Sequence, residues 1–164
     1  MEQQAALEVS LSVQFAKWKG AHVIGTASIG NTEFLKSLGT DEVIDYKAQR
    51  FEDEVHNVDV VLDTIGGDTF DRTWGVLKPG GFLVTTFEDV QEEMARAHDV
   101  HAVHIISQAD GNELAQIARI IDEQHIKPIV TTILPLNEAR KAQGMSESGH
   151  TLGKIVLRVA EDPQ

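Results

Sequence analysis

The spacing of apolar residues near the start of the chain predicts a helix. Leu7, Leu11, Phe15 and Trp18 recur at i, i+4, i+8 and i+11, so they fall on one face of a helix of 3.6-residue period. We therefore expect a first helix over residues 5–19.

Short β-rich runs alternate with helical stretches along the rest of the chain. The run VDVVLDTIG (58–66) is almost continuously apolar, as in a strand buried on both faces of a parallel sheet, and is predicted to be the central strand. The other predicted strands are residues 21–27, 42–45, 82–86, 101–106, 129–133 and 154–159. The predicted helices between them cover residues 31–39, 68–77, 88–98, 113–124 and 137–143. This alternation predicts an α/β fold with a doubly wound parallel sheet.

Length and composition are those of one globular domain. The 164 residues suffice for a single domain over residues 1–164, which would bury roughly two-thirds of its unfolded surface. A net charge of −12 repels nucleic acid and anionic lipid. No apolar run reaches the roughly 18 residues of a membrane span and no signal peptide is visible, so we expect a cytoplasmic protein. The sequence has no cysteine, which excludes disulfides and thiolate catalysis.

Four segments, in order, resemble one known family. They are VQFAKWKGAHVIGTAS (13–28), NTEFLKSLGTDEVIDY (31–46), DVVLDTIGGDTFDRTWGVLKPGGFLV (59–84) and LPLNEARKAQGMSESGHTLGKIVLRV (134–159). Together they resemble the cofactor-binding half of the medium-chain dehydrogenase/reductase superfamily, in its zinc-independent, NADPH-dependent quinone oxidoreductase branch. The resemblance implies a Rossmann-like domain over residues 13–160, NADP as the cofactor, and a quinone or enone as the substrate of the intact enzyme.

Residues 1–12 depart from that family. Its members have a catalytic domain, a first strand and a turn such as HGAAGGVGSFAVQ at or before this point, so the chain resembles an N-terminally truncated member. The glycines of that turn let backbone amides approach the cofactor pyrophosphate. Ala6, Leu7, Glu8 and Val9 stand there instead, and the Glu8 carboxylate would repel the phosphates. We therefore expect weak or absent NADPH binding.

A frameshift would explain the atypical segment. Codons permitted for MEQQAALEVSLSVQ can be chosen so that reading from the third base gives GAAGGVGSFAV, the turn expected of the family. A four-base duplication just before the Val13 codon would then restore the frame. The alternative is a naturally divergent N-terminal helix, and the coding DNA decides between the two.

The resemblance assigns one group of residues to the 2′-phosphate side of NADPH. Ser28 and Tyr46 match the family's positions there, whereas Asn31 stands where the family usually has a lysine, which weakens the site by one charge. The structural alternatives are that Ser28 is a turn residue and that Asn31 caps a helix.

A second group follows two predicted strands at the carboxyl edge of the sheet, where open α/β sheets bind ligands. Thr64, Gly66 and Gly67 follow the apolar strand, and Thr86 and Phe87 end the next one. The resemblance places them beside the ribose and nicotinamide, and the alternative is ordinary turn chemistry.

The sequence predicts neither a metal site nor a catalytic residue. His98, His101 and His104 have a suggestive spacing, but His101 and His104 would point to opposite faces of a strand.

Three functions remain open at this point. The first is a cofactor-binding domain remnant of an NADPH-dependent quinone or enone oxidoreductase, inactive by itself. The second is a non-catalytic module that dimerises through a sheet edge exposed by the missing first strand. The third is an oxidoreductase whose catalytic half is supplied by another chain.

Overall fold

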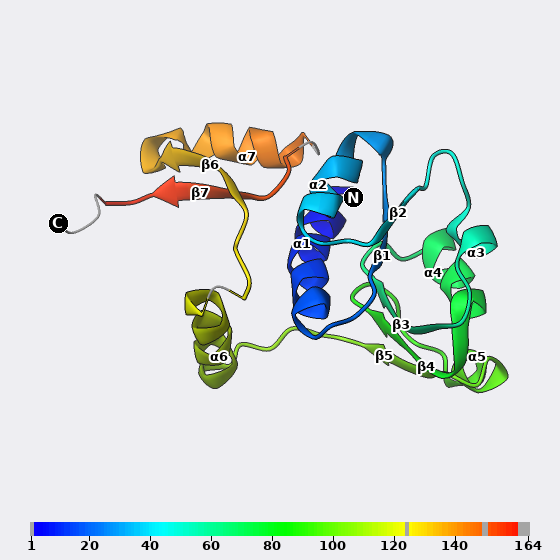
Figure 1. Cartoon of the computed structure of the whole chain (residues 1–164). Coiled ribbons are helices and arrows are strands. Elements are labelled where there is room, and N and C mark those ends of the chain that lie inside the picture. Colours follow the sequence, from blue (N-terminus) through cyan, green and yellow to red (C-terminus); the bar gives the residue numbers. More distant parts are fainter. Residues whose placement is uncertain (1, 124, 149–150, 161–164) are drawn as a thin grey trace. The chain divides into compact units, whose positions relative to one another are not determined.

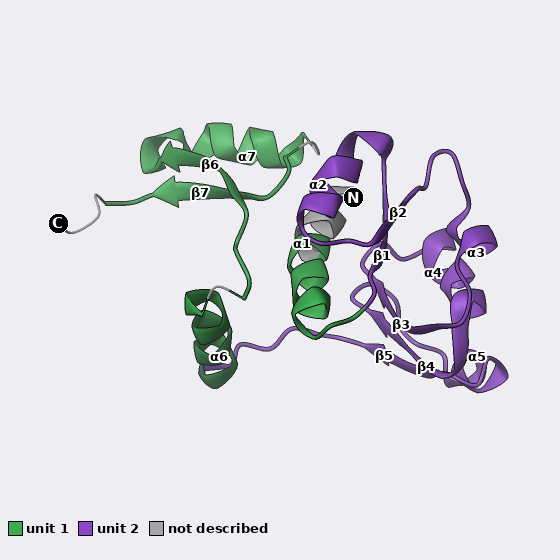
Figure 2. Ribbon diagram, viewed as in Figure 1, with its two compact units in different colours: residues 1–21, 112–164 green, residues 22–111 purple. Residues whose placement is uncertain are grey.

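The computed structural model describes residues 2–123, 125–148 and 151–160, with side chains from residue 9 onward. The chain divides into two compact units, residues 22–111 and residues 1–21 with 112–164 (Figure 2). The expectation of a single domain over residues 1–164 stays a prediction.

Five parallel strands form the sheets of the unit 22–111 (Figure 1). Strand β1 (Ile24–Ala27) pairs with β2 (Glu42–Asp45) in one sheet. A second sheet has the order β3 (Val58–Asp63), β4 (Leu77–Thr85), β5 (His101–His104). Parallel strands joined through helices confirm the predicted α/β class.

The helices of this unit are short, and most were predicted. They are η1 (Ile29–Asn31), α2 (Thr32–Ser37), α3 (Phe51–Glu54), α4 (Asp68–Thr73), η2 (Trp74–Val76) and α5 (Glu92–Ala97). The sequence pattern did not predict α3, because a single turn with three consecutive acidic residues shows no helical periodicity. β4 also begins earlier than the predicted start at residue 82, since residues 77–81 continue the strand through a register shift in its pairing with β3.

Two apolar clusters hold the unit 22–111 together. In the first, Leu83 is completely buried, and Phe70 meets Trp74 edge to face at 5.4 Å between ring centroids. The second cluster consists of Ile44, Phe51 and Val76. Ile24 of β1 and Val61 of β3 both pack against this second cluster, so both sheets border it.

The predicted place of the apolar strand is wrong. β4, not β3, is in the middle of the three-stranded sheet, and β3 is at its edge. Val60 and Leu62 of β3 are 59% and 42% exposed. The strand register places Phe82 and Val103 on the same face of the sheet, and these two side chains are similarly exposed. The apolar run indicated burial on two faces, but within this unit only the face that carries Leu83 and Val61 is covered.

The other unit contains a helix at the start of the chain and a two-stranded sheet near its end. Its elements are α1 (Glu2–Trp18), α6 (Gly111–Asp122), β6 (Val130–Pro135), η3 (Leu136–Glu138), α7 (Ala139–Glu147) and β7 (Lys154–Arg158). β6 and β7 pair in parallel. Gln14 of α1 exchanges two hydrogen bonds with the backbone of Lys127, and Trp18 stacks on His125 at 5.2 Å.

The first helix is confirmed, and it is continuous through residues 6–9. Within residues 2–23 the structure contains no strand before β1, which agrees with the predicted lack of a first strand and glycine-rich turn. Among the described helices, none combines the length and apolar character needed to cross a bilayer.

Candidate functional site

The carboxyl ends of β3 and β4 are joined by a buried polar pair. Asp63 and Thr85 are the last residues of their strands and lie opposite each other in the parallel register. Thr85 donates through Oγ1 to Asp63 Oδ2 at 3.0 Å, and both side chains are buried, at 3% and 0% exposure for Asp63 and Thr85. A buried carboxylate requires such partners, so this pair fixes the two strand ends relative to each other.

The same two side chains shape the loops that follow. Asp63 accepts hydrogen bonds from the backbone N–H groups of Ile65 and Gly66, each at 3.2 Å. Thr85 Oγ1 accepts from the N–H groups of Phe87 and Glu88, also at 3.2 Å. Both loops at this edge are therefore anchored to one buried centre.

Gly66 and Gly67 give the first loop a backbone that other residues rarely adopt. Their φ angles are +77° and +58°. A Cβ on Gly66 would lie 2.8 Å from Glu88 Oε1 and 3.2 Å from Phe87 Cβ. The Gly67 N–H donates to Glu88 Oε1 at 2.8 Å, so Glu88 bridges the two loops.

The structure brings together all five residues predicted beside the ribose and nicotinamide. Thr64 is buried beside Asp63, and Phe87 is 42% exposed. The Thr86 hydroxyl is buried and has no hydrogen-bond partner among the described residues. The sequence alone assigned no functional role to Asp63 or Glu88, because nothing in the linear pattern shows that Asp63 meets Thr85 or that Glu88 meets the Gly67 amide.

Ser28, Asn31 and Tyr46 form a separate group at the carboxyl ends of β1 and β2. Ala27 lies opposite Asp45 in the register, so Ser28 and Tyr46 follow neighbouring strand ends. The Tyr46 N–H donates to the Ala27 carbonyl at 3.2 Å, and the Asn31 N–H donates to the Ser28 carbonyl at 2.9 Å. Asn31 occupies the N-cap position of α2, but its side chain makes no capping hydrogen bond.

The histidines that follow α5 and lie in β5 face different surroundings. His101 stacks on Phe82 at 4.8 Å, whereas His104 Nδ1 lies 3.2 Å from an Asp89 carboxylate oxygen. His98 lies against Trp74 at 5.7 Å. Within the described ranges, no group of three or more His, Cys, Asp or Glu side chains is placed to hold a metal ion.

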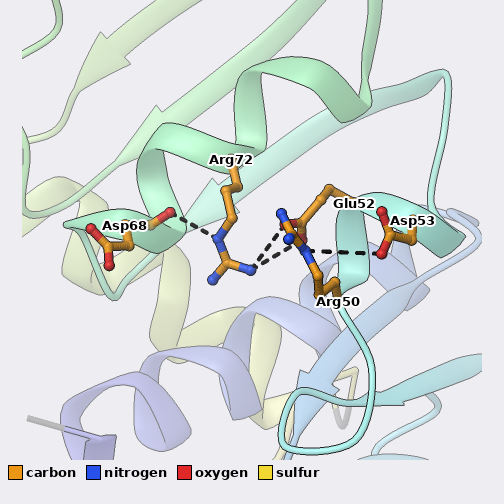
Figure 3. Close-up of polar contacts among 5 residues, drawn as sticks. All are labelled: Arg50, Glu52, Asp53, Asp68 and Arg72. Carbon is orange, nitrogen blue, oxygen red and sulfur yellow. Dashed lines mark hydrogen bonds and ion pairs between the residues drawn. The ribbon is translucent and has the colours of Figure 1, made fainter.

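A second polar cluster joins Arg50 and α3 to α4 (Figure 3). Glu52 Oε1 accepts from Arg50 at 2.7 Å, and Glu52 Oε2 accepts from Arg72 at 3.1 Å. Burial raises the pKa of Glu52, but hydrogen bonds from its own backbone N–H, Arg50 and Arg72 outweigh it, so the pKa lies below its ordinary value. The Arg72 Nε also donates to the Asp68 carbonyl at 3.0 Å. Both guanidinium groups hydrogen-bond to Glu52, so the cluster is an ion-pair network that links α3 to α4.

Comparison with known proteins agrees with this architecture. The family model described as zinc-binding dehydrogenase matches residues 38–157. The chain is 31% identical over 152 residues to the NADPH-dependent alkenal/one oxidoreductase of Arabidopsis thaliana chloroplasts, covering 90% of this chain and 37% of that protein. It is 29% identical over 179 residues to the mitochondrial NAD(P)H oxidoreductase RTN4IP1 of Mus musculus, covering 92% of this chain and 45% of that protein.

A solved structure supports the same relationship. The quinone oxidoreductase from Coxiella burnetii superimposes with a TM-score of 0.80 at 32% identity, over 92% of this chain and 49% of that one. The chain thus spans about half the length, or less, of the relatives it matches. The predicted doubly wound, Rossmann-like fold is confirmed, and the chain belongs to the zinc-binding dehydrogenase family, corresponding to the cofactor-binding half of the medium-chain dehydrogenase/reductase superfamily.

Proposed function

We propose that this chain is the cofactor-binding half of an oxidoreductase that uses NADPH to reduce a quinone or an enone. The relatives named above include a quinone oxidoreductase and an NADPH-dependent alkenal/one oxidoreductase, which supports both the cofactor and the acceptor class. In such a reaction the bound cofactor supplies the hydride, and the protein supplies binding and orientation.

One observation carries the proposal: the buried Asp63–Thr85 pair anchors two loops in which one polar atom has no hydrogen-bond partner among the described residues. Thr86 Oγ1 is buried, so a ligand hydroxyl or amide that displaces the atoms covering it and pairs with it would remove an unfavourable desolvation. The adjacent Gly67 carries no Cβ, and no heavy atom lies within 4 Å of the place where one would be, which allows a ligand close to the backbone. These residues fit the ribose and nicotinamide end of a dinucleotide.

The 2′-phosphate end has a weaker set of partners. Ser28 and Tyr46 offer hydroxyl groups at the ends of β1 and β2, and Asn31 offers an amide without a charge. α1 is helical through residues 6–9, where a glycine-rich turn would present amides to the pyrophosphate. We therefore expect the 164-residue chain to bind NADPH weakly and to show no turnover by itself.

Nucleotide fluorescence tests this proposal. Titration of the chain with NADPH should saturate with a dissociation constant on the order of 1 mM, and Thr86→Val should weaken the binding because it removes only the hydroxyl. Thr131→Val, an exposed threonine of β6, is the matched control. Micromolar affinity, or NADPH oxidation with a quinone, would contradict the proposal that the chain binds NADPH weakly and is inactive by itself. The absence of any saturable binding would contradict the proposed cofactor-binding role.

A second candidate function is assembly, favoured by the sheet edges. β1 pairs only with β2 and β3 only with β4 among the described strands, so each presents one unpaired edge. Such edges are templates for pairing with another chain. Light scattering after size exclusion should then give the mass of a dimer at micromolar concentration, whereas a monomer would refute this role.

The cellular location stays a prediction. Composition led to the expectation of a cytoplasmic protein, but the relatives include mitochondrial and chloroplast proteins. We propose the cytoplasm, and fractionation of cells that express the tagged chain would test it.

A further inference from the structure

The two sheets of the unit 22–111 border one apolar cluster without pairing with each other. Ile24 of β1 and Val58 and Val61 of β3 pack against the cluster of Ile44, Phe51 and Val76. No strand among the described residues bonds to the outer edge of β1 or of β3. Two parallel edges therefore flank the same cluster, and no described strand uses their outward-facing backbone donors and acceptors.

The strand order of doubly wound folds tells what would fit there. Their usual order is 3-2-1-4-5-6, so strand 1 lies between strands 2 and 4. Here β1 and β2 correspond to strands 2 and 3, and β3, β4 and β5 correspond to strands 4, 5 and 6. The matching occupant is one extended segment, parallel to both β1 and β3.

Residues 7–15 of this chain have the sequence of such a segment. In LEVSLSVQF, apolar and polar residues alternate strictly through nine positions, which is the pattern of a strand. Val9 and Val13 are β-branched and favour strands over helices. Leu7, Leu11 and Phe15 belong to both the helical stripe and the alternating row, so the sequence supports both α1 and a strand.

The length of the connection decides which copy can supply the strand. Only eight residues, 16–23, lie between Phe15 and the start of β1 at Ile24. A parallel neighbour of β1 in the same chain needs a crossover of about a dozen residues or more. The same chain therefore cannot place residues 7–15 parallel to its own β1.

We infer that residues 7–15 of a second copy of this chain insert as a parallel strand between β1 and β3. This inference rests on the assembly role proposed above and names the segment responsible for it. Because the exchange is reciprocal, the product is a symmetric dimer. The apolar row of the segment faces the cluster of Ile44, Phe51 and Val76, and the polar row, with Ser10 and Ser12, faces the open side that carries Val60.

The exchange has an identifiable cost and gain. Converting α1 forfeits the two hydrogen bonds between Gln14 and Lys127, and Val13 leaves a buried position. In return, the backbone groups on both free edges gain partners, and apolar residues cover the cluster. The backbone groups of residues 7–15 are hydrogen-bonded in both the helical and the strand form. The additional hydrogen bonds of the dimer are therefore those made by the backbone groups on the free edges of β1 and β3.

Cysteine cross-linking tests the inference, since the chain has no natural cysteine. Chains carrying Ser12→Cys and chains carrying Val60→Cys are mixed, equilibrated and oxidised with oxidised glutathione. Adjacent strands bring side chains on one face within the reach of a disulfide. We expect a covalent heterodimer in this mixture. Val103→Cys is the matched control, because Val103 is 47% exposed on the same face but belongs to β5.

The outcomes separate the inference from the assembly role. A dimer by light scattering, with the Ser12–Val60 cross-link at least about tenfold more abundant than the Ser12–Val103 one, supports insertion. A dimer in which the two cross-links are equally abundant or absent overturns insertion but leaves assembly standing. A monomer overturns both. Val9→Ala provides a second measurement, since it favours the helix over the strand and should lower the dimer fraction without unfolding the monomer.

Discussion

The Thr85 hydroxyl donates to the Asp63 carboxylate at 3.0 Å in a fully buried position, and this one hydrogen bond ties β4 to β3 where both strands end. Each partner also accepts hydrogen bonds from a following loop, Asp63 from residues 65 and 66 and Thr85 from residues 87 and 88. The loops that carry the proposed cofactor residues therefore share one anchor.

Asp63→Asn should destabilise the fold. The amide is similar in size, but its NH₂ group cannot accept hydrogen bonds and would face donors, so the free energy of unfolding should fall by about 1–3 kcal/mol. Urea denaturation measures the change. Asp71→Asn, at an exposed position of α4, should leave the free energy nearly unchanged, and equal effects of the two substitutions would contradict the anchoring role.

Gly66→Ala should be similarly damaging. An alanine at a φ of +77° is strained, and its Cβ would meet Glu88 Oε1 at 2.8 Å. We expect a loss of about 1–3 kcal/mol in the free energy of unfolding. Gly75→Ala is the control, because a Cβ there has no heavy atom within 4 Å. A wild-type melting temperature for Gly66→Ala would show that the loop does not need this backbone conformation.

Acid should weaken the ion-pair network around Glu52. Desolvation raises the pKa of Glu52, but its hydrogen bonds together lower the pKa by more. The folded-state pKa therefore lies below the ordinary value of 4.5. A lowered carboxyl pKa stabilises the fold above the ordinary value, and this contribution is lost as the pH falls from about 4.5 through the folded-state pKa. Melting temperatures of wild type and Glu52→Gln should therefore converge as the pH falls through this range. Glu54→Gln, an exposed change on the same helix, controls for the loss of charge, and a constant difference between wild type and Glu52→Gln would contradict the prediction.

Local patterns predicted most of the elements. The alternation of β-rich runs with helices located every strand, and the i, i+4 spacing in α1 predicted that helix, because both signals are carried by neighbouring residues. The residues predicted beside the ribose and nicotinamide, from Thr64 to Phe87, also meet at one edge, since consecutive parallel strands end on the same side.

Long-range relationships were harder to predict. The apolar run of β3 indicated a buried strand, but it carried no information on the order of the strands. In the structure β4 is in the middle of its sheet, and Val60 of β3 is exposed. Asp63 pairs with the Thr85 hydroxyl of the neighbouring strand, and Glu88 accepts from the Gly67 amide of the other loop. Both partners lie more than 20 residues away in the sequence, so the sequence around each carboxylate carries no sign of these contacts. The alternation in residues 7–15 was hidden because the helical stripe uses several of the same residues.

Asn31→Lys should strengthen the preference for NADPH. Asn31 lies at the start of α2, next to the ends of β1 and β2, and it has no charge to offer a 2′-phosphate. A lysine there adds a favourable Coulomb interaction of about 1 kcal/mol, which is about fivefold in affinity. Fluorescence titrations should show tighter NADPH binding with NADH binding unchanged, and the gain should shrink in high salt. Asn31→Gln keeps the amide and should change neither affinity. Equal tightening of NADPH and NADH by the lysine would mean that position 31 does not face the 2′-phosphate, since only that group distinguishes the two nucleotides.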